Sequence, residues 1–208
     1  ASAKSIPVIN NIALESVVDR REGNIAINSE SAVNKERFRV EKGTRIQVED
    51  NSRFSFHIGS LARVALFGDT EWELSALTDT FIGINLDKGS IAVSFDGTQK
   101  RSMEITTPDS IVRVTGTIFT VEVVDNGTTR VGVIEGSVEV DSRFTDADTV
   151  TVTEGRLGSV SGKESLIALT DEHRSLAAEM LITHYPEELT KLVTFDGSPE
   201  QVKVEVDG

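Results

Sequence analysis

The chain has 208 residues, 38% hydrophobic and 26% charged, which is enough for one large domain or for one domain with a small appendage. Its 21 Lys and Arg residues against 34 Asp and Glu residues give a formal net charge of −13, which repels phosphate backbones and anionic lipid headgroups and argues against a nucleic-acid or membrane-surface role. The absence of cysteine excludes disulfides, thiolate nucleophiles and zinc ribbons.

Residues 1–16 are expected to be a linker or a strand. They contain no apolar core of signal-peptide length, and no stretch of the chain approaches the roughly 20 apolar residues of a membrane span. The chain opens with small residues rather than Met, so a processed mature protein and a piece cut downstream of a membrane anchor are both compatible with it. We therefore expect membrane association only through an anchor absent from this chain.

Residues 17–162 are expected to form one all-β domain, because short β-branched runs alternate there with Gly, Asn and Asp. Apolar and polar residues alternate within 45–49, 52–58 and 117–123, which predicts strands that each bury one face.

Two turns are predicted within this domain. Asn126-Gly127 separates the strand-like runs 118–124 and 129–134, and Asn-Gly adopts the positive φ angles of a tight hairpin turn, which also accounts for the formal glycosylation sequon at Asn126. Pro108-Asp109 lies between a strand that ends near Thr106 and the strand 111–114, where a proline marks a turn because it cannot donate into a central ladder.

A loose internal repeat consists of a glycine, a small hydroxyl residue and an alternating run. It begins at Gly43, Gly89, Gly116 and Gly136, and with Gly68 and Gly155 included the glycines are 19 to 27 residues apart. This spacing leaves two arrangements open: a solenoid-like or rolled antiparallel fold, or an ordinary sandwich.

Residues 163–208 are expected to form an α/β extension that is possibly truncated. Thr170 and Glu172 can cap a helix, and Leu176, Ala177, Met180, Leu181 and His184 follow helical spacing up to Tyr185. The run 201–206 then alternates like a strand.

The residues that carry enzyme chemistry do not form a recognised pattern. The three histidines, His57, His173 and His184, lack metal-site spacing, and there is neither a phosphate-binding glycine loop nor a Gly-x-Ser-x-Gly elbow. The acidic pair Asp146 and Asp148 is interpreted as a solvated loop rather than a calcium site. We therefore assign no catalytic, cofactor-binding or metal-binding residue, and we do not expect an enzyme.

Trp72 is the single tryptophan and stands between two glutamates. Two interpretations remain open for it. It is either a core residue or an aromatic anchor for a protein partner, and we take it as the partner-binding candidate.

One long segment resembles a known family. The run 105–123, ITTPDSIVRVTGTIFTVEV, and the run 128–140, TTRVGVIEGSVEV, resemble the FecR-type domain, with matching positions at Thr107, Pro108, Gly116, Thr117, Phe119, Glu135 and Gly136. The resemblance covers roughly residues 17–161.

This resemblance implies an all-β domain with solenoid-like coils, so the expected fold is mainly β and solenoid-like or rolled. The small helical C-terminal appendage at residues 163–208 is expected from its own residue pattern and does not obviously match the family. The resemblance also implies a periplasmic or cell-surface sensor domain that acts through protein contact in sigma-factor regulation and needs no cofactor. The implied partner is the signalling domain of a TonB-dependent outer-membrane transporter. A structural or adhesive cell-envelope domain with the same fold is the alternative.

Overall fold

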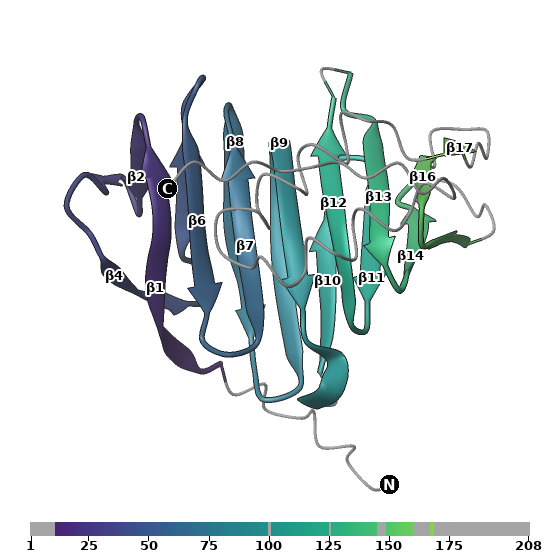
Figure 1. The fold of residues 1–208 in the computed structure, drawn as a ribbon, viewed down its shortest axis with the longest axis horizontal. Coiled ribbons are helices and arrows are strands. Elements are labelled where there is room, and N and C mark those ends of the chain that lie inside the picture. Colours follow the sequence, from purple (N-terminus) through teal and green to yellow (C-terminus); the bar gives the residue numbers. More distant parts are fainter. Residues whose placement is uncertain (1–10, 100, 125, 145–148, 160–166, 169–208) are drawn as a thin grey trace, which may run out of the picture.

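The computed structural model describes residues 11–99, 101–124, 126–144, 149–159 and 167–168 (Figure 1). These residues are mostly β-strand, which confirms the expected fold class, and their only helix is the short 3-10 turn η1 (Gly97–Gln99). The helix expected near residues 170–185 and the strand expected at 201–206 lie outside the described residues.

The strands follow the chain from one end of the molecule to the other (Figure 1). They are β1 (Ala13–Glu22), β2 (Ile25–Ile27), β3 (Glu30–Ser31), β4 (Arg37–Glu41), β5 (Arg45–Val48), β6 (Arg53–Ile58), β7 (Ala62–Phe67), β8 (Thr70–Leu77), β9 (Phe81–Phe95), β10 (Ser102–Thr106), β11 (Ser110–Val114), β12 (Thr117–Val123), β13 (Thr129–Glu135), β14 (Ser137–Ser142), β15 (Val150–Thr153), β16 (Arg156–Ser159) and β17 (Ile167–Ala168).

Sixteen of the strands form two facing sheets, and β4 pairs antiparallel with the first half of β1. Sheet I has the order β1-β6-β7-β9-β12-β13-β16-β17. Sheet II has the order β3-β2-β5-β8-β9-β10-β11-β14-β15 and contains one parallel pair, β9 with β10. The long strand β9 belongs to both, pairing with β8 through residue 88 and with β7 and β12 from residue 89 onward.

Two-stranded hairpins alternate between the sheets as the chain advances: β6-β7 and β12-β13 lie in sheet I, and β10-β11 and β14-β15 lie in sheet II. This alternation gives a rolled, solenoid-like arrangement, which is one of the two that the glycine spacing left open and the one that the family resemblance implied. Residues with positive φ mark the corners where the chain changes sheet: Gly23, Asn51, Asp69, Gly89, Gly116, Gly136 and Gly155.

The predicted turns are confirmed. The hairpin β12-β13 turns at Gly127, which has φ +79°, and the Val124 N–H donates to the Thr128 carbonyl at 3.0 Å. Pro108 and Asp109 connect β10 to β11.

The core lies between the two sheets and is lined by the alternate residues of each strand. Phe54 and Phe56 from sheet I pack with Phe38 of β4, and Phe56 meets the Trp72 ring of sheet II edge-on at 5.6 Å. Trp72 is only 2% exposed. The structure therefore places Trp72 in the core, and the partner-docking alternative would need an exposed ring that the described structure does not have.

The division into residues 1–16, 17–162 and 163–208 remains a prediction. Strand β1 runs without interruption through the first boundary, and the second boundary lies outside the described residues.

Candidate functional site

The motif residues Thr107 and Pro108 form the turn between β10 and β11. The Ser110 N–H donates to Thr107 Oγ1 at 3.0 Å, and the Thr107 N–H donates to the Ser110 carbonyl at 2.9 Å. Thr107 Oγ1 also lies 2.6 Å from Thr129 Oγ1 at the start of β13, and all three residues are buried. The motif threonine therefore links a turn of sheet II to a strand of sheet I.

Asp109 completes this link. Its carboxylate accepts hydrogen bonds from the Ser110 hydroxyl at 2.9 Å, the Thr129 N–H at 3.2 Å and the Thr129 hydroxyl. The Arg143 guanidinium donates to the Thr107 carbonyl at 2.7 Å, so the chain after β14 joins the same network. Motif matching did not identify Asp109, Thr129 or Arg143. The run Thr-Pro-Asp-Ser contained a usable signal for Asp109, because these residues favour turns closed by their own side chains.

Gly116 and Gly136 lie at the other end of β11, at two neighbouring corners. Gly116 has φ +120°, and a Cβ there would lie 3.1 Å from Gly97 Cα. Gly136 has φ +90°, and a Cβ there would lie 2.9 Å from the Gly116 carbonyl oxygen. Only glycine fits such close packing of consecutive corners. Thr117 Oγ1 adds a hydrogen bond to the Ser137 carbonyl at 3.0 Å.

The structure thus places the motif residues at the two ends of β11 and in the core, and it does not gather them around one pocket. Thr107 and Pro108 lie at one end of β11, Gly116, Thr117, Glu135 and Gly136 lie at the other, and Phe119 is fully buried between the sheets. These residues specify the architecture, so a contact with a partner depends on the outer faces and edges of the sheets.

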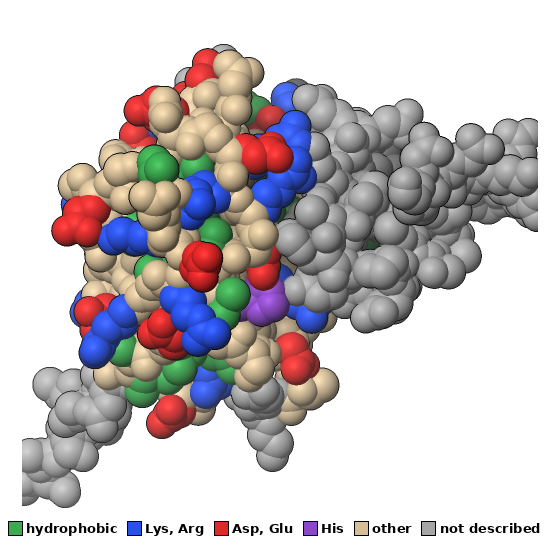
Figure 2. All heavy atoms as spheres, turned by 60° about the vertical axis from the view of Figure 1, so that its left-hand side comes forward, with side chains coloured by type: hydrophobic (Ala, Val, Ile, Leu, Met, Phe, Trp, Pro, Cys, Tyr) green, Lys and Arg blue, Asp and Glu red, His purple; other side chains and the backbone are tan. Residues whose placement is uncertain are grey.

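The outer face of sheet II is charged. Its strands are joined by ion pairs between Arg45 and Glu73 at 2.9 Å, and between Arg113 and both Glu104, at 3.3 Å, and Asp141. The outer face of sheet II therefore has the character of a solvated surface. At the end of the molecule that carries β1, β2 and β4, the space-filling view likewise shows acidic and basic side chains interspersed, with hydrophobic side chains in small separate patches (Figure 2).

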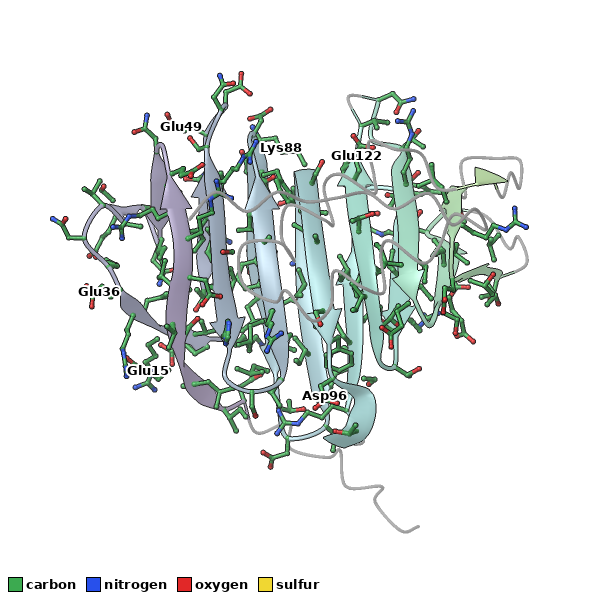
Figure 3. All side chains as sticks on the ribbon, in the orientation of Figure 1. Glu15, Glu36, Glu49, Lys88, Asp96 and Glu122 are labelled. Atoms are coloured by element: carbon green, nitrogen blue, oxygen red, sulfur yellow. The ribbon has the colours of Figure 1, made fainter. Side chains whose placement is uncertain are left out.

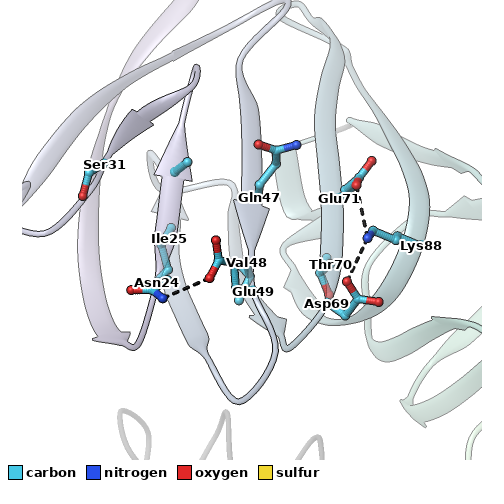
Figure 4. Close-up of a pocket in the computed structure, with 11 residues that line it drawn as sticks. Asn24, Ile25, Ser31, Gln47, Val48, Glu49, Asp69, Thr70, Glu71 and Lys88 are labelled. Carbon is cyan, nitrogen blue, oxygen red and sulfur yellow. Dashed lines mark hydrogen bonds and ion pairs between the residues drawn. The ribbon is translucent and has the colours of Figure 1, made fainter.

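A shallow hollow of about 430 Å³ opens at one end of this face (Figure 4). Lys88 lies there between two carboxylates, 2.8 Å from Asp69 and 3.2 Å from Glu71, and Asn24 donates to Glu49 at 2.9 Å. Hydrogen bonding to Asp69, and then to Glu71, raises the pKa of Lys88. Glu49 and Lys88 lie at one rim of the molecule and Asp96 at the opposite rim (Figure 3). The hollow presents paired charges and no nucleophile activated by a base.

The outer face of sheet I differs from that of sheet II, because small and apolar side chains cross its centre. A cluster of buried residues lies on this side, separate from the main core: Ala65, Ala92, Ile118, Ile134 and Leu157, with Phe67 packed against it.

Only one of the three histidines lies among the residues that the structure describes. His57 lies on the outer face of sheet I, 2.9 Å from Asp19, whereas His173 and His184 fall outside the described residues. Within the described ranges no group of three His, Asp or Glu side chains is arranged to hold a metal ion. The same part of the chain has no helix of the length and apolarity needed to cross a membrane.

The sequence model of the FecR protein family matches residues 28–139. Because this match covers more than half of the 208 residues, the chain belongs to the FecR family. No curated protein matches the chain.

Two crystal structures from Parabacteroides distasonis ATCC 8503, both of proteins described as proposed anti-sigma factors, share the fold. The structure at 2.50 Å resolution has a TM-score of 0.51 and 16% identity, over 64% of this chain and 62% of its own. The structure at 1.65 Å resolution has a TM-score of 0.52 and 14% identity, over 72% of this chain and 74% of its own. The chain therefore spans less than two thirds of the first of these proteins.

Proposed function

We propose that this chain is a regulator domain that acts outside the cytoplasm by protein contact, in a pathway that controls a sigma factor. The observation that carries the proposal is membership of the FecR family over residues 28–139. The description of both structural neighbours as proposed anti-sigma factors supports the same role. The signalling domain of a TonB-dependent outer-membrane transporter is the partner we propose.

The surface of the chain suits binding of a protein more than binding of a polyanion. The net charge of −13 opposes nucleic acid, and the ion pairs of sheet II leave no basic patch on that face. Among the described strands β15 pairs only with β14, which gives sheet II an edge where an extended peptide could add a strand.

The proposal is tested by crosslinking in cells of the full-length parent protein, followed by affinity recovery and mass spectrometry. A photoreactive residue is placed at Thr151, an exposed position of the edge strand β15. The matched control carries it at Gln47, which is also exposed but lies in β5, with a paired strand on either side.

We expect the Thr151 probe to recover a TonB-dependent transporter or a protein of the sigma-factor pathway, and the Gln47 probe to recover much less of it. Recovery of wall, filament or surface proteins alone would overturn the regulatory role in favour of a structural or adhesive envelope domain.

A further inference from the structure

The two edges of sheet II differ in how they are protected. At one edge β3 has only two residues, and its Glu30 forms an ion pair with Lys35 at 2.9 Å. At the other edge the run 149–153, which contains β15, reads Thr-Val-Thr-Val-Thr and has neither a charge nor a proline. Soluble proteins usually protect a sheet edge with a very short strand, a charge or a proline. The edge at β15 lacks all three and is therefore suited to pairing with another strand.

The register of β14 with β15 shows which backbone groups face away from the sheet. The Glu154 N–H donates to the Gly136 carbonyl at 3.1 Å, in the same register that pairs Val152 with Val138. Hydrogen-bonded and non-hydrogen-bonded pairs alternate along an antiparallel ladder. The backbone N–H and C=O groups of Thr151 and Thr153 therefore point away from β14, where no described strand meets them.

Unpaired carboxylates accompany this edge. Glu139 lies directly opposite Thr151 in β14, and Glu154 follows β15; both are exposed, and neither carboxylate has an ion pair or hydrogen bond in the part of the chain that the structure describes. The next carboxylate of β14, Asp141, is by contrast bound by Arg113 and by the Thr149 hydroxyl at 2.5 Å. A strand added beside β15 would therefore meet negative charge that the chain itself leaves uncompensated.

We propose that β15 pairs with an extended segment of a protein partner in which apolar residues alternate with Lys or Arg. Its apolar side chains would continue the inward face set by Val150 and Val152, and its basic side chains would lie on the outer face near Glu139. The same carboxylates oppose pairing with a second copy of this chain, because like charges would then meet across the new strand pair. This inference deepens the role in protein contact proposed above and rests on it.

The first test uses synthetic peptides with the full chain. The probe is an acetylated seven-residue peptide in which Lys and Val alternate. One control peptide has Glu in place of each Lys, and the other has the composition of the probe with all Lys before all Val. We expect the probe to bind and both controls to bind at least about tenfold more weakly. Absence of binding, or equal binding of the alternating and block peptides, would overturn the proposal.

A substitution at the edge tests the backbone contact. Thr151→Pro removes an N–H that points away from β14, so it costs no hydrogen bond of the ladder, and it should weaken probe binding about tenfold. Thr151→Val keeps that N–H and should leave binding unchanged. Fluorescence of Trp72 checks that both variants are folded, because this single tryptophan is buried in the core. Equal binding by the two folded variants would overturn the proposal.

A second substitution tests the charge. Glu139→Lys should weaken probe binding at least about fivefold. Glu36→Lys is the matched control, because it makes the same change of net charge at an exposed, unpaired glutamate at the end of the molecule away from β14 (Figure 3). Equal weakening by the two variants would reduce the effect to the overall charge of the chain and would overturn the assignment to β15.

Amide hydrogen exchange locates the bound peptide. Saturating probe should slow exchange at Thr151 and Thr153 at least about tenfold and leave Ser31, in the opposite edge strand β3, unchanged. A dimer of the chain that Thr151→Pro abolishes would assign the edge to a second copy and would overturn the proposal. The peptide measurements involve no sigma-factor pathway, so they can fail while the crosslinking in cells succeeds, and the reverse.

Discussion

The hydroxyls of Thr107 and Thr129 lie 2.6 Å apart in a buried network that also includes Asp109. Thr129→Val keeps the shape of the side chain but removes the hydroxyl, and it leaves the Thr107 and Asp109 oxygens short of a buried partner. We expect it to lower the free energy of unfolding by about 1–3 kcal/mol, measured by urea denaturation. Thr151→Val, at an exposed position of β15, is the control and should change it by less than about 0.5 kcal/mol. Equal losses would contradict a role for the network in stability.

Gly43 and Gly136 have nearly the same φ, +88° and +90°, but different surroundings. A Cβ at Gly43 would meet nothing within 4 Å, whereas one at Gly136 would lie 2.9 Å from the Gly116 carbonyl oxygen. Gly43→Ala should therefore lower the free energy of unfolding only by the cost of a positive φ, about 1 kcal/mol. Gly136→Ala should lower it by at least about 1 kcal/mol more. Thermal and urea unfolding measure both. Equal decreases in the free energy of unfolding would contradict the claim that the close packing of the corners requires glycine at position 136.

At the scale of the strand pair, Lys88 of β9 joins the Asp69 corner to Glu71 of β8. The side chains are exposed, so Lys88→Met should lower the free energy of unfolding by at most about 1 kcal/mol at pH 7 and low salt, and by less at high salt. Lys42→Met, at an exposed lysine of the corner between β4 and β5, is the control.

The pH dependence of this contribution has a definite sign. The pKa of Lys88 is raised above its ordinary value of 10.5, first by the hydrogen bond to Asp69. The contribution is therefore complete at pH values below 10.5 and is lost as the pH rises through the higher pKa of the folded state. Urea denaturation of the natural chain and of Lys88→Met should converge above that pKa. A difference that persists unchanged there would contradict the charge-based explanation.

Strands with one buried face were predictable element by element, because alternation is a local property. Ile46 and Val48, and likewise Phe54 and Phe56, point into the core as the pattern indicated. The turn at Gly127 was predictable for the same reason, since the residues that require it are adjacent in sequence.

The outer faces were not predictable in this way. In β12, Phe119 faces the core while Ile118 and Thr120 face outward, yet all three are buried. The alternation of β12 therefore does not show whether its outward-facing side chains are buried or exposed. The alignment of Ala65, Ala92 and Thr120 across sheet I depends on the registers between strands far apart in the sequence, which no local pattern contains. The position of Trp72 likewise follows from its packing against Phe56 of the other sheet.

At the scale of the whole molecule, the hairpins alternate between two sheets, and the motif residues lie at the corners and in the core between them. The outer faces of the two sheets differ from each other. One face is charged, and the other carries a separate cluster of small and apolar residues. The regulatory role that we propose would depend on what these two faces and their edges contact.

The measurement that tests this account most directly is the transcript profile of cells in which residues 28–139 have been deleted from the full-length protein, compared with cells that carry the natural chain. The account predicts a change confined to the genes served by one sigma factor, with cell-surface attachment unaffected. Unchanged sigma-dependent transcription together with loss of attachment would contradict it.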